Sequence, residues 1–120
     1  MTVDLVALCE RQPDAGMTLA ALQACGPELR LTTVERGALV QLCDADERPL
    51  VTIEGPRLVQ VPGEVERLLG VTDAPHPVWW VEARALTDGA PAGEADAPRI
   101  ARRFTAALLS QTGGVSWSSR

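Results

Sequence analysis

Residues 78–86 read VWWVEARAL and predict a β-strand with two unlike faces. Neighbouring side chains of a strand point to opposite sides, so the alternate positions from 79 to 85 form a wholly apolar face. The other face carries Trp80, Glu82 and Arg84 and is amphipathic. The apolar face predicts contact with a core, whereas Trp80 is expected either under a second layer of structure or near the surface.

The segment that follows this strand predicts a helix and a final strand. Residues 98–111 place apolar side chains at helical spacing and begin with a proline, which is favoured in the first turn of a helix. Gly113 and Gly114 then end the helix, and residues 115–117 form a short strand. A phosphate-binding glycine pair precedes a helix, so this pair is interpreted as a helix stop. Residues 87–96 are rich in Gly, Pro and Ala and predict a flexible loop.

Apolar alternation and turn residues predict the other elements. The expected helices span residues 17–25 and 64–69, and the expected strands span residues 2–9, 29–35, 38–43, 50–54 and 57–61. Gly55 and Pro56 are interpreted as a turn between the last two of these strands. Thr18 is expected to cap the helix over residues 17–25.

This order of elements predicts the α+β fold class. We expect residues 1–120 to form a single α+β domain with one mixed or mainly antiparallel sheet and two main helices packed on it. A ferredoxin-like core with an inserted hairpin is one specific version of this prediction.

The composition argues against several classes of function. A chain of 120 residues with 46% apolar content is expected to fold, and its net charge of −5 lacks the positive field that nucleic acids or anionic lipids attract. We therefore expect neither a nucleic-acid partner nor a membrane partner. The N-terminal segment lacks a basic region, and no run approaches the roughly 20 apolar residues of a membrane span, so we expect a cytoplasmic location.

Residues that usually carry chemistry are few and scattered. Cys9, Cys25 and Cys43 are odd in number and widely spaced, which predicts reduced thiols packed as small apolar groups. The lone histidine, His76, lies between two prolines with no third group to support Cys–His catalysis. Residues 44–48 begin like a calcium loop but lack its central Gly and distal Glu, so they are interpreted as a hairpin turn. We expect no catalytic residue, no metal site and no cofactor.

The candidate interface consists of Trp80, Glu82 and Arg84. Tryptophan is enriched at binding hot spots, which makes Trp80 the main candidate. Glu82 and Arg84 share its face and are expected to form a surface ion pair. The alternative for Trp80 is that a loop or the helix over residues 64–69 covers it.

A weaker candidate is an anion site near the start of the last helix. It would consist of Arg99, Arg102 and Arg103. Glu94 and Asp96 lie close in sequence and are expected to compete for the same arginines.

The function hypothesis that follows is a non-catalytic protein-interaction or accessory module of a larger assembly. Its expected partner is another protein or a second copy of the chain in a homodimer. One alternative is a small inhibitor or immunity-type protein whose acidic surface blocks a basic active site. Another is a small-molecule-binding domain or small enzyme with a pocket near Trp80.

Overall fold

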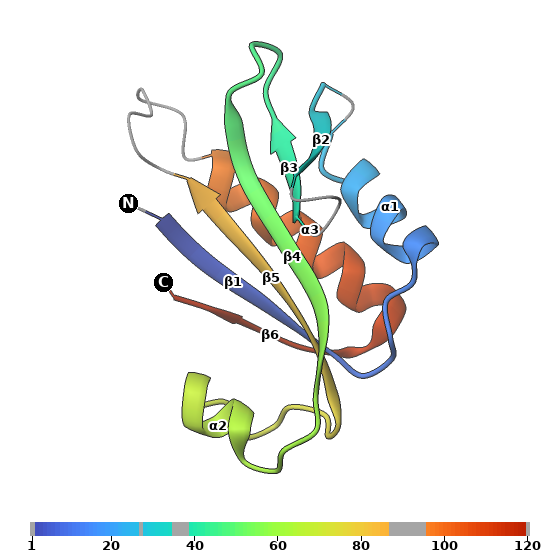
Figure 1. Cartoon of the computed structure of the whole chain (residues 1–120), viewed down its shortest axis with the longest axis vertical. Coiled ribbons are helices and arrows are strands. Elements are labelled where there is room, and N and C mark those ends of the chain that lie inside the picture. The colour runs from blue at the N-terminus through green and yellow to red at the C-terminus, as the bar shows by residue number, and fades with distance from the viewer. Residues whose placement is uncertain (1, 27, 35–38, 87–95, 120) are drawn as a thin grey trace.

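The computed structural model describes residues 2–26, 28–34, 39–86 and 96–119 (Figure 1). In chain order the elements are β1 (Thr2–Cys9), α1 (Ala15–Gln23), β2 (Arg30–Val34), β3 (Leu39–Cys43), β4 (Pro49–Val59), α2 (Glu64–Leu69), β5 (Val78–Leu86), α3 (Asp96–Thr112) and β6 (Gly114–Ser118). They form the predicted α+β fold with one sheet. The loop predicted over residues 87–96 lies outside the described residues except at Asp96, which opens α3.

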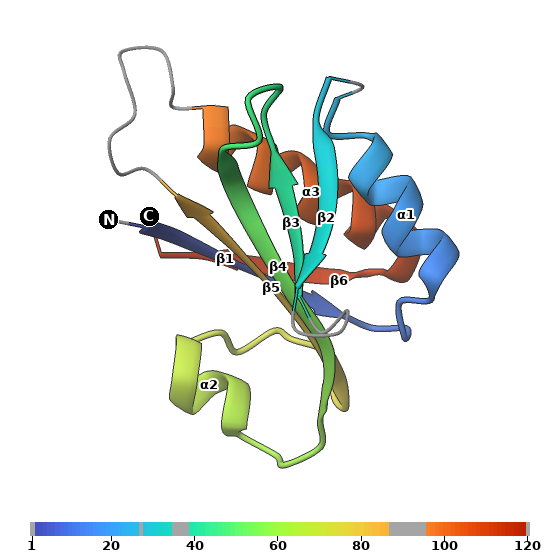
Figure 2. The same cartoon turned by 45° about the horizontal axis from the view of Figure 1, so that its top comes forward.

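The six strands form one antiparallel sheet in the order β2-β3-β4-β5-β1-β6. Figure 2 shows β2 at one margin of this sheet, with α1 beside it. Without β2, β3 and the short α2, the chain order reads β1, α1, β4, β5, α3, β6. This is a β-α-β-β-α-β arrangement, the element order of a ferredoxin-like core, so that finer prediction stays open.

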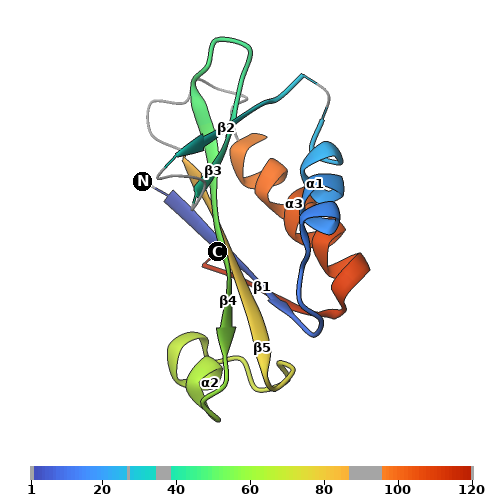
Figure 3. The same ribbon diagram turned by 45° about the vertical axis from the view of Figure 1, so that its right-hand side comes forward.

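The main core lies between the sheet and the two longer helices. Figure 3 shows α1 and α3 on one side of the sheet, which we call the inner face. Phe104 and Leu108 of α3 are fully buried there against Val3 and Leu5 of β1. The helix spacing of α3 predicted this apolar stripe, and hydrophobic burial of this kind is the main driving force that stabilises a fold.

A second, smaller apolar cluster lies on the opposite side, which we call the outer face. It joins β1, α2 and β5 through Val6, Leu8, Val65, Val78 and Trp80. The short α2 covers this end of the outer face (Figure 3). The rest of the outer face over the central strands carries the polar residues Asp4, Thr52, Glu54, Glu82 and Arg84.

The prediction of a turn at Gly55 and Pro56 was wrong, because both residues lie inside the continuous strand β4. The cross-strand register with β5 shifts between Glu54 and Arg57, which marks a β-bulge. Gly55 has a φ of +114°, and a Cβ placed there would lie 2.7 Å from the backbone oxygen of Trp80. Glycine is therefore needed for the close approach of β4 to β5.

The first helix begins two residues earlier than predicted, and Thr18 does not cap it. Asp14 is the N-cap of α1, and its Oδ1 accepts a hydrogen bond of 2.8 Å from the backbone N–H of Met17. Both Asp and Thr are good N-cap residues, so composition alone did not separate them. The extended conformation of Asp14 decides the start of the helix.

Candidate interaction face

The outer face brings together charged side chains from three neighbouring strands. Asp4 of β1 lies directly opposite Arg84 of β5, and Glu54 of β4 lies directly opposite Glu82 of β5. Directly opposite residues of an antiparallel pair point to the same face. We call these four residues the outer charged cluster.

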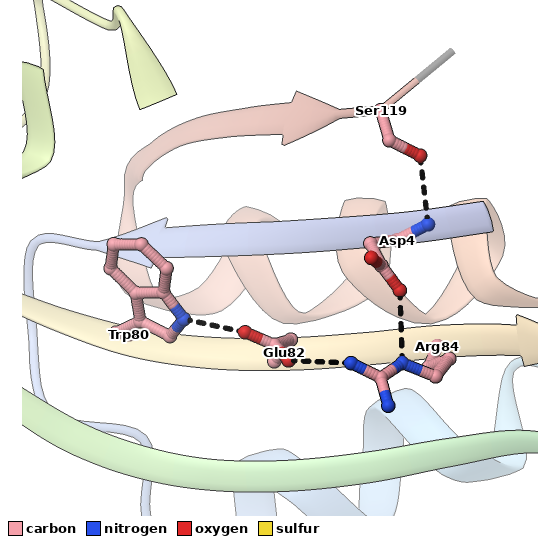
Figure 4. A network of polar contacts seen from close by, with 5 residues as sticks. All are labelled: Asp4, Trp80, Glu82, Arg84 and Ser119. Atoms are coloured by element: carbon pink, nitrogen blue, oxygen red, sulfur yellow. Dashed lines mark hydrogen bonds and ion pairs between the residues drawn. The ribbon is translucent and has the colours of Figure 1, made fainter. Parts of the chain in front are cut away.

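Arg84 is the centre of a polar network within this cluster (Figure 4). Its Nε donates a hydrogen bond of 3.0 Å to Oδ1 of Asp4, and its Nη2 lies 3.7 Å from Oε2 of Glu82. The bond to Asp4 is the main cause of a raised Arg84 pKa, so the guanidinium stays charged. The predicted pair of Glu82 and Arg84 is confirmed. Because the Arg84 side chain is 53% exposed, solvent screening limits each pair to about 1 kcal/mol at most.

Trp80 is buried within the chain, at 6% exposure. It packs against Leu8 of β1 and Val65 of α2, so the alternative in which helix 64–69 helps to cover it is the arrangement found. Its Nε1 donates a hydrogen bond of 3.2 Å to Oε1 of Glu82 (Figure 4). The guanidinium carbon of Arg57 lies 5.9 Å from the centre of the Trp80 ring. Trp80 therefore holds Glu82 in position from the neighbouring place on the same face of β5.

The outer charged cluster contains three carboxylates and the guanidinium of Arg84, and Arg57 adds a second guanidinium at the edge of the cluster, beside Trp80. Glu54 and Glu82 carry like charges directly across the β4–β5 pair. Such a pair destabilises a sheet by an amount on the order of 0.2–1 kcal/mol. Glu82 is fixed from two sides by Trp80 and Arg84, so it does not turn away from Glu54 without losing these contacts.

Two adjoining depressions open at this carboxylate pair, and Glu54 and Glu82 line both of them. The first has a volume of about 270 Å³ and is lined by Glu54, Gly55, Pro56, Arg57, Trp80 and Glu82. The second has a volume of about 310 Å³ and is lined by Leu39, Gln41, Thr52, Glu54, Glu82, Arg84 and Leu86. The bulge at Gly55 shapes the first depression, because it bends β4 beside Trp80.

The arginines predicted as an anion site lie on α3, on the opposite side of the sheet. Arg99, Arg102 and Arg103 are all exposed. The side chains of Glu94 and Asp96, expected to compete for them, lie outside the described residues. The two candidate sets are therefore separated by the sheet, and the anion site stays a prediction.

The three cysteines are free and buried, as the sequence predicted. Burial raises the pKa of the Cys9 thiol and raises that of Cys25 to about 11 against the opposing charge of Arg103. Both thiols are therefore held in the protonated form, which is a poor nucleophile. His76 is exposed and lines a separate pocket of about 200 Å³ beside α2.

The hairpin interpretation of residues 44–48 is confirmed. Oδ1 of Asp44 accepts hydrogen bonds of 2.9 and 3.0 Å from the backbone N–H groups of Asp46 and Arg48. These bonds, with the Arg48 side chain, lower the pKa of the Asp44 carboxyl. Among the described residues, no group of three or more His, Cys, Asp and Glu side chains is arranged to hold a metal ion.

Sequence reasoning found the half of this site that lies on one strand and missed Asp4 and Glu54. Alternation along residues 78–86 placed Trp80, Glu82 and Arg84 on one face, as the structure does. Asp4 and Glu54 join them only through the register of β1 and β4 against β5. A polar residue on an otherwise apolar strand was the available signal for each of them.

Comparison with protein-family models, with curated proteins and with solved structures finds no match to this chain. None of the helices in the described ranges has the length and apolar character needed to cross a membrane. The geometry of the outer face therefore carries the functional argument alone.

Proposed function

We propose that the chain is a non-catalytic protein-interaction module whose outer face binds a protein partner that presents a basic side chain. The observation that carries this proposal is the pair of like charges formed by Glu54 and Glu82 between two open depressions. The partner's cation would lie between the two carboxylates.

A bound cation would relieve a repulsion that the free chain retains. An arginine guanidinium suits this position because it donates two parallel hydrogen bonds to carboxylates. Trp80 and Arg84 already hold Glu82 in one orientation, so little side-chain freedom is lost on binding. The exposed Glu54 supplies the second acceptor.

The charge of the whole chain supports the same class of partner. A net charge of −5 favours encounter with a basic surface and repels acidic ones. Association through this face should weaken as salt is added, because the charges at its rim are exposed.

The test is affinity capture from the cells that contain the chain, followed by mass-spectrometric identification. The immobilised wild-type chain is compared with the Glu54→Gln/Glu82→Gln double variant and with Asp73→Asn, which changes an exposed loop carboxylate. Glutamine keeps the shape of glutamate and can still accept the Trp80 hydrogen bond. We expect a protein retained by the wild type and Asp73→Asn, lost from the double variant and released by salt. Equal retention by the double variant would contradict the proposal.

A further inference from the structure

Strand β2 forms one edge of the sheet and carries a single charged residue, Arg30. In the part of the chain that the structure describes, it pairs only with β3. Its residues Arg30 to Thr33 are exposed. Edge strands of monomers are usually blunted by charges, Pro or bulges, because unpaired backbone groups recruit other strands. Here the single charge, on Arg30, lies 3.9 Å from Glu47 of the neighbouring turn.

An apolar groove runs beside this edge on the inner face. It has a volume of about 280 Å³ and is lined by Leu19, Leu22, Gln23, Gly26, Leu29, Leu31 and Leu42. The helix α3 packs on β1, β4, β5 and β6, so this groove belongs to the part of the sheet beside α1. Leu19 of α1 and Leu31 of β2 are 51% and 48% exposed. Covering these two leucines would remove apolar surface from water.

We propose that β2 pairs antiparallel with β2 of a second copy of this chain, about a two-fold axis at Leu31, so that the two sheets become one. A second copy fits this edge because each chain presents half-exposed leucines, and the leucines of one chain would cover those of the other. The inference is independent of the outer-face proposal, since the edge and the groove lie away from the outer charged cluster.

The register follows from which side chains would face one another. Two sheets related by an axis perpendicular to them place residues of the same face opposite each other. With Leu31 opposite Leu31, Arg30 lies opposite Thr32, and the leucines of both grooves meet. A shift in one direction places Arg30 opposite Arg30, which is repulsive. A shift in the other direction places Leu31 opposite Thr33 and leaves the leucines apart.

The size of a stable interface requires α1 to take part. Dimer interfaces bury at least about 1,000 Å² in total. The five-residue strand β2 is too short to supply this alone, so the leucines of the groove must contribute. Leu19 projects from α1 at the groove and is the residue expected to extend the contact.

The first experiment measures mass by sedimentation velocity and light scattering at about 1–100 μM, a range that resolves dimers of ordinary affinity. The wild type is expected at twice the monomer mass. Leu31→Glu is expected to be a folded monomer, with a dissociation constant raised on the order of 100-fold, because two like charges would face each other at the axis. Leu68→Glu changes a residue of α2 that is equally exposed, at 50%, and is expected to stay dimeric.

The second experiment tests the register by oxidative cross-linking. Leu31→Cys should give a disulfide-linked dimer, because opposite Cα atoms about 4.5–5.5 Å apart are within disulfide range. Thr33→Cys should not, because its counterpart would lie four positions away, about 13 Å along the strand. The native cysteines are buried and should give little background.

Three results would overturn the proposal. They are a wild-type chain that is monomeric at about 100 μM, a dimer that persists in Leu31→Glu, and cross-linking through Thr33→Cys in place of Leu31→Cys. A monomer whose β2 instead binds a strand of a different protein, with loss of that binding in Leu31→Glu, would also reject the second copy as the occupant.

Discussion

Replacing Glu54 with glutamine should stabilise the free chain while it removes part of the proposed binding site. Glu54 lies directly across β4–β5 from Glu82, and the Trp80 and Arg84 contacts hold Glu82 in place. The Cβ atoms of directly opposite residues lie about 5 Å apart, and like charges at such a separation repel by roughly 0.8 kcal/mol even at the dielectric constant of water. Attraction between Glu54 and Arg84 offsets part of this repulsion, because the charge of Glu54 is one of the causes that raise the pKa of Arg84. The expected net gain is about 0.2–1 kcal/mol.

The assay is reversible urea unfolding at pH 7, supported by thermal unfolding at one fixed protein concentration. For a chain of this size the gain corresponds to a rise in Tm of about 1–5 °C. The gain should shrink in about 1 M salt, where the Debye length is about 3 Å. Asp73→Asn removes the same charge from an exposed loop and controls for the net charge of the chain.

The reasoning would be refuted if Glu54→Gln lowered the free energy of unfolding. It would equally be refuted if the variant changed stability no more than Asp73→Asn does. Either result would mean that repulsion between Glu54 and Glu82 does not destabilise the free chain, so a partner would have no such repulsion to relieve.

Three further changes test the fold and the buried thiols. Gly55→Ala should lower the free energy of unfolding by about 2–4 kcal/mol, because its Cβ would lie 2.7 Å from a backbone oxygen of β5. Gly63→Ala, at a φ of +81° with open space around the Cβ, should lower it by only about 1 kcal/mol in the same urea titration. Asp14→Ala should destabilise the chain by about 1 kcal/mol and Thr18→Ala by less, as measured by urea unfolding, because Asp14 caps α1. The folded pKa of Cys25, at about 11, lies above its value in the unfolded chain, so its stabilising contribution is complete below pH 9 and is lost as the pH rises to 11. That loss should reach about 2 kcal/mol between unfolding curves at pH 8 and pH 11, and Cys25→Ala should reduce this pH dependence. An unchanged pH dependence would show that burial does not control this thiol.

The elements that could be predicted from the sequence are those whose pattern is strong and local. Residues 78–86 alternate clearly and form β5 with the predicted bounds, and the helix over residues 64–69 likewise matches α2. The continuity of β4 could not be predicted, since Gly55 followed by proline usually marks a turn. The close approach of β4 to β5 decides the outcome there, and that approach is a tertiary contact.

The candidate site was likewise predicted only where its residues share a local pattern. Trp80, Glu82 and Arg84 share one strand, so alternation alone placed them together. The position of Glu54 opposite Glu82 depends on the register between strands separated by α2, which no local pattern specifies. The burial of Trp80 also depends on where α2 packs.

The most direct test of the outer-face proposal is an NMR titration of the isotope-labelled chain with a short capped peptide that contains one arginine. The same peptide with citrulline, a neutral isostere of arginine, is the control. We expect the indole N–H of Trp80 and the amides around Glu54 to shift with the arginine peptide, with a Kd of about 1–10 mM. The citrulline peptide and the Glu54→Gln/Glu82→Gln variant should give no such shifts. Equal shifts with both peptides, or none at these residues up to about 10 mM, would contradict the proposal that this face binds a basic side chain.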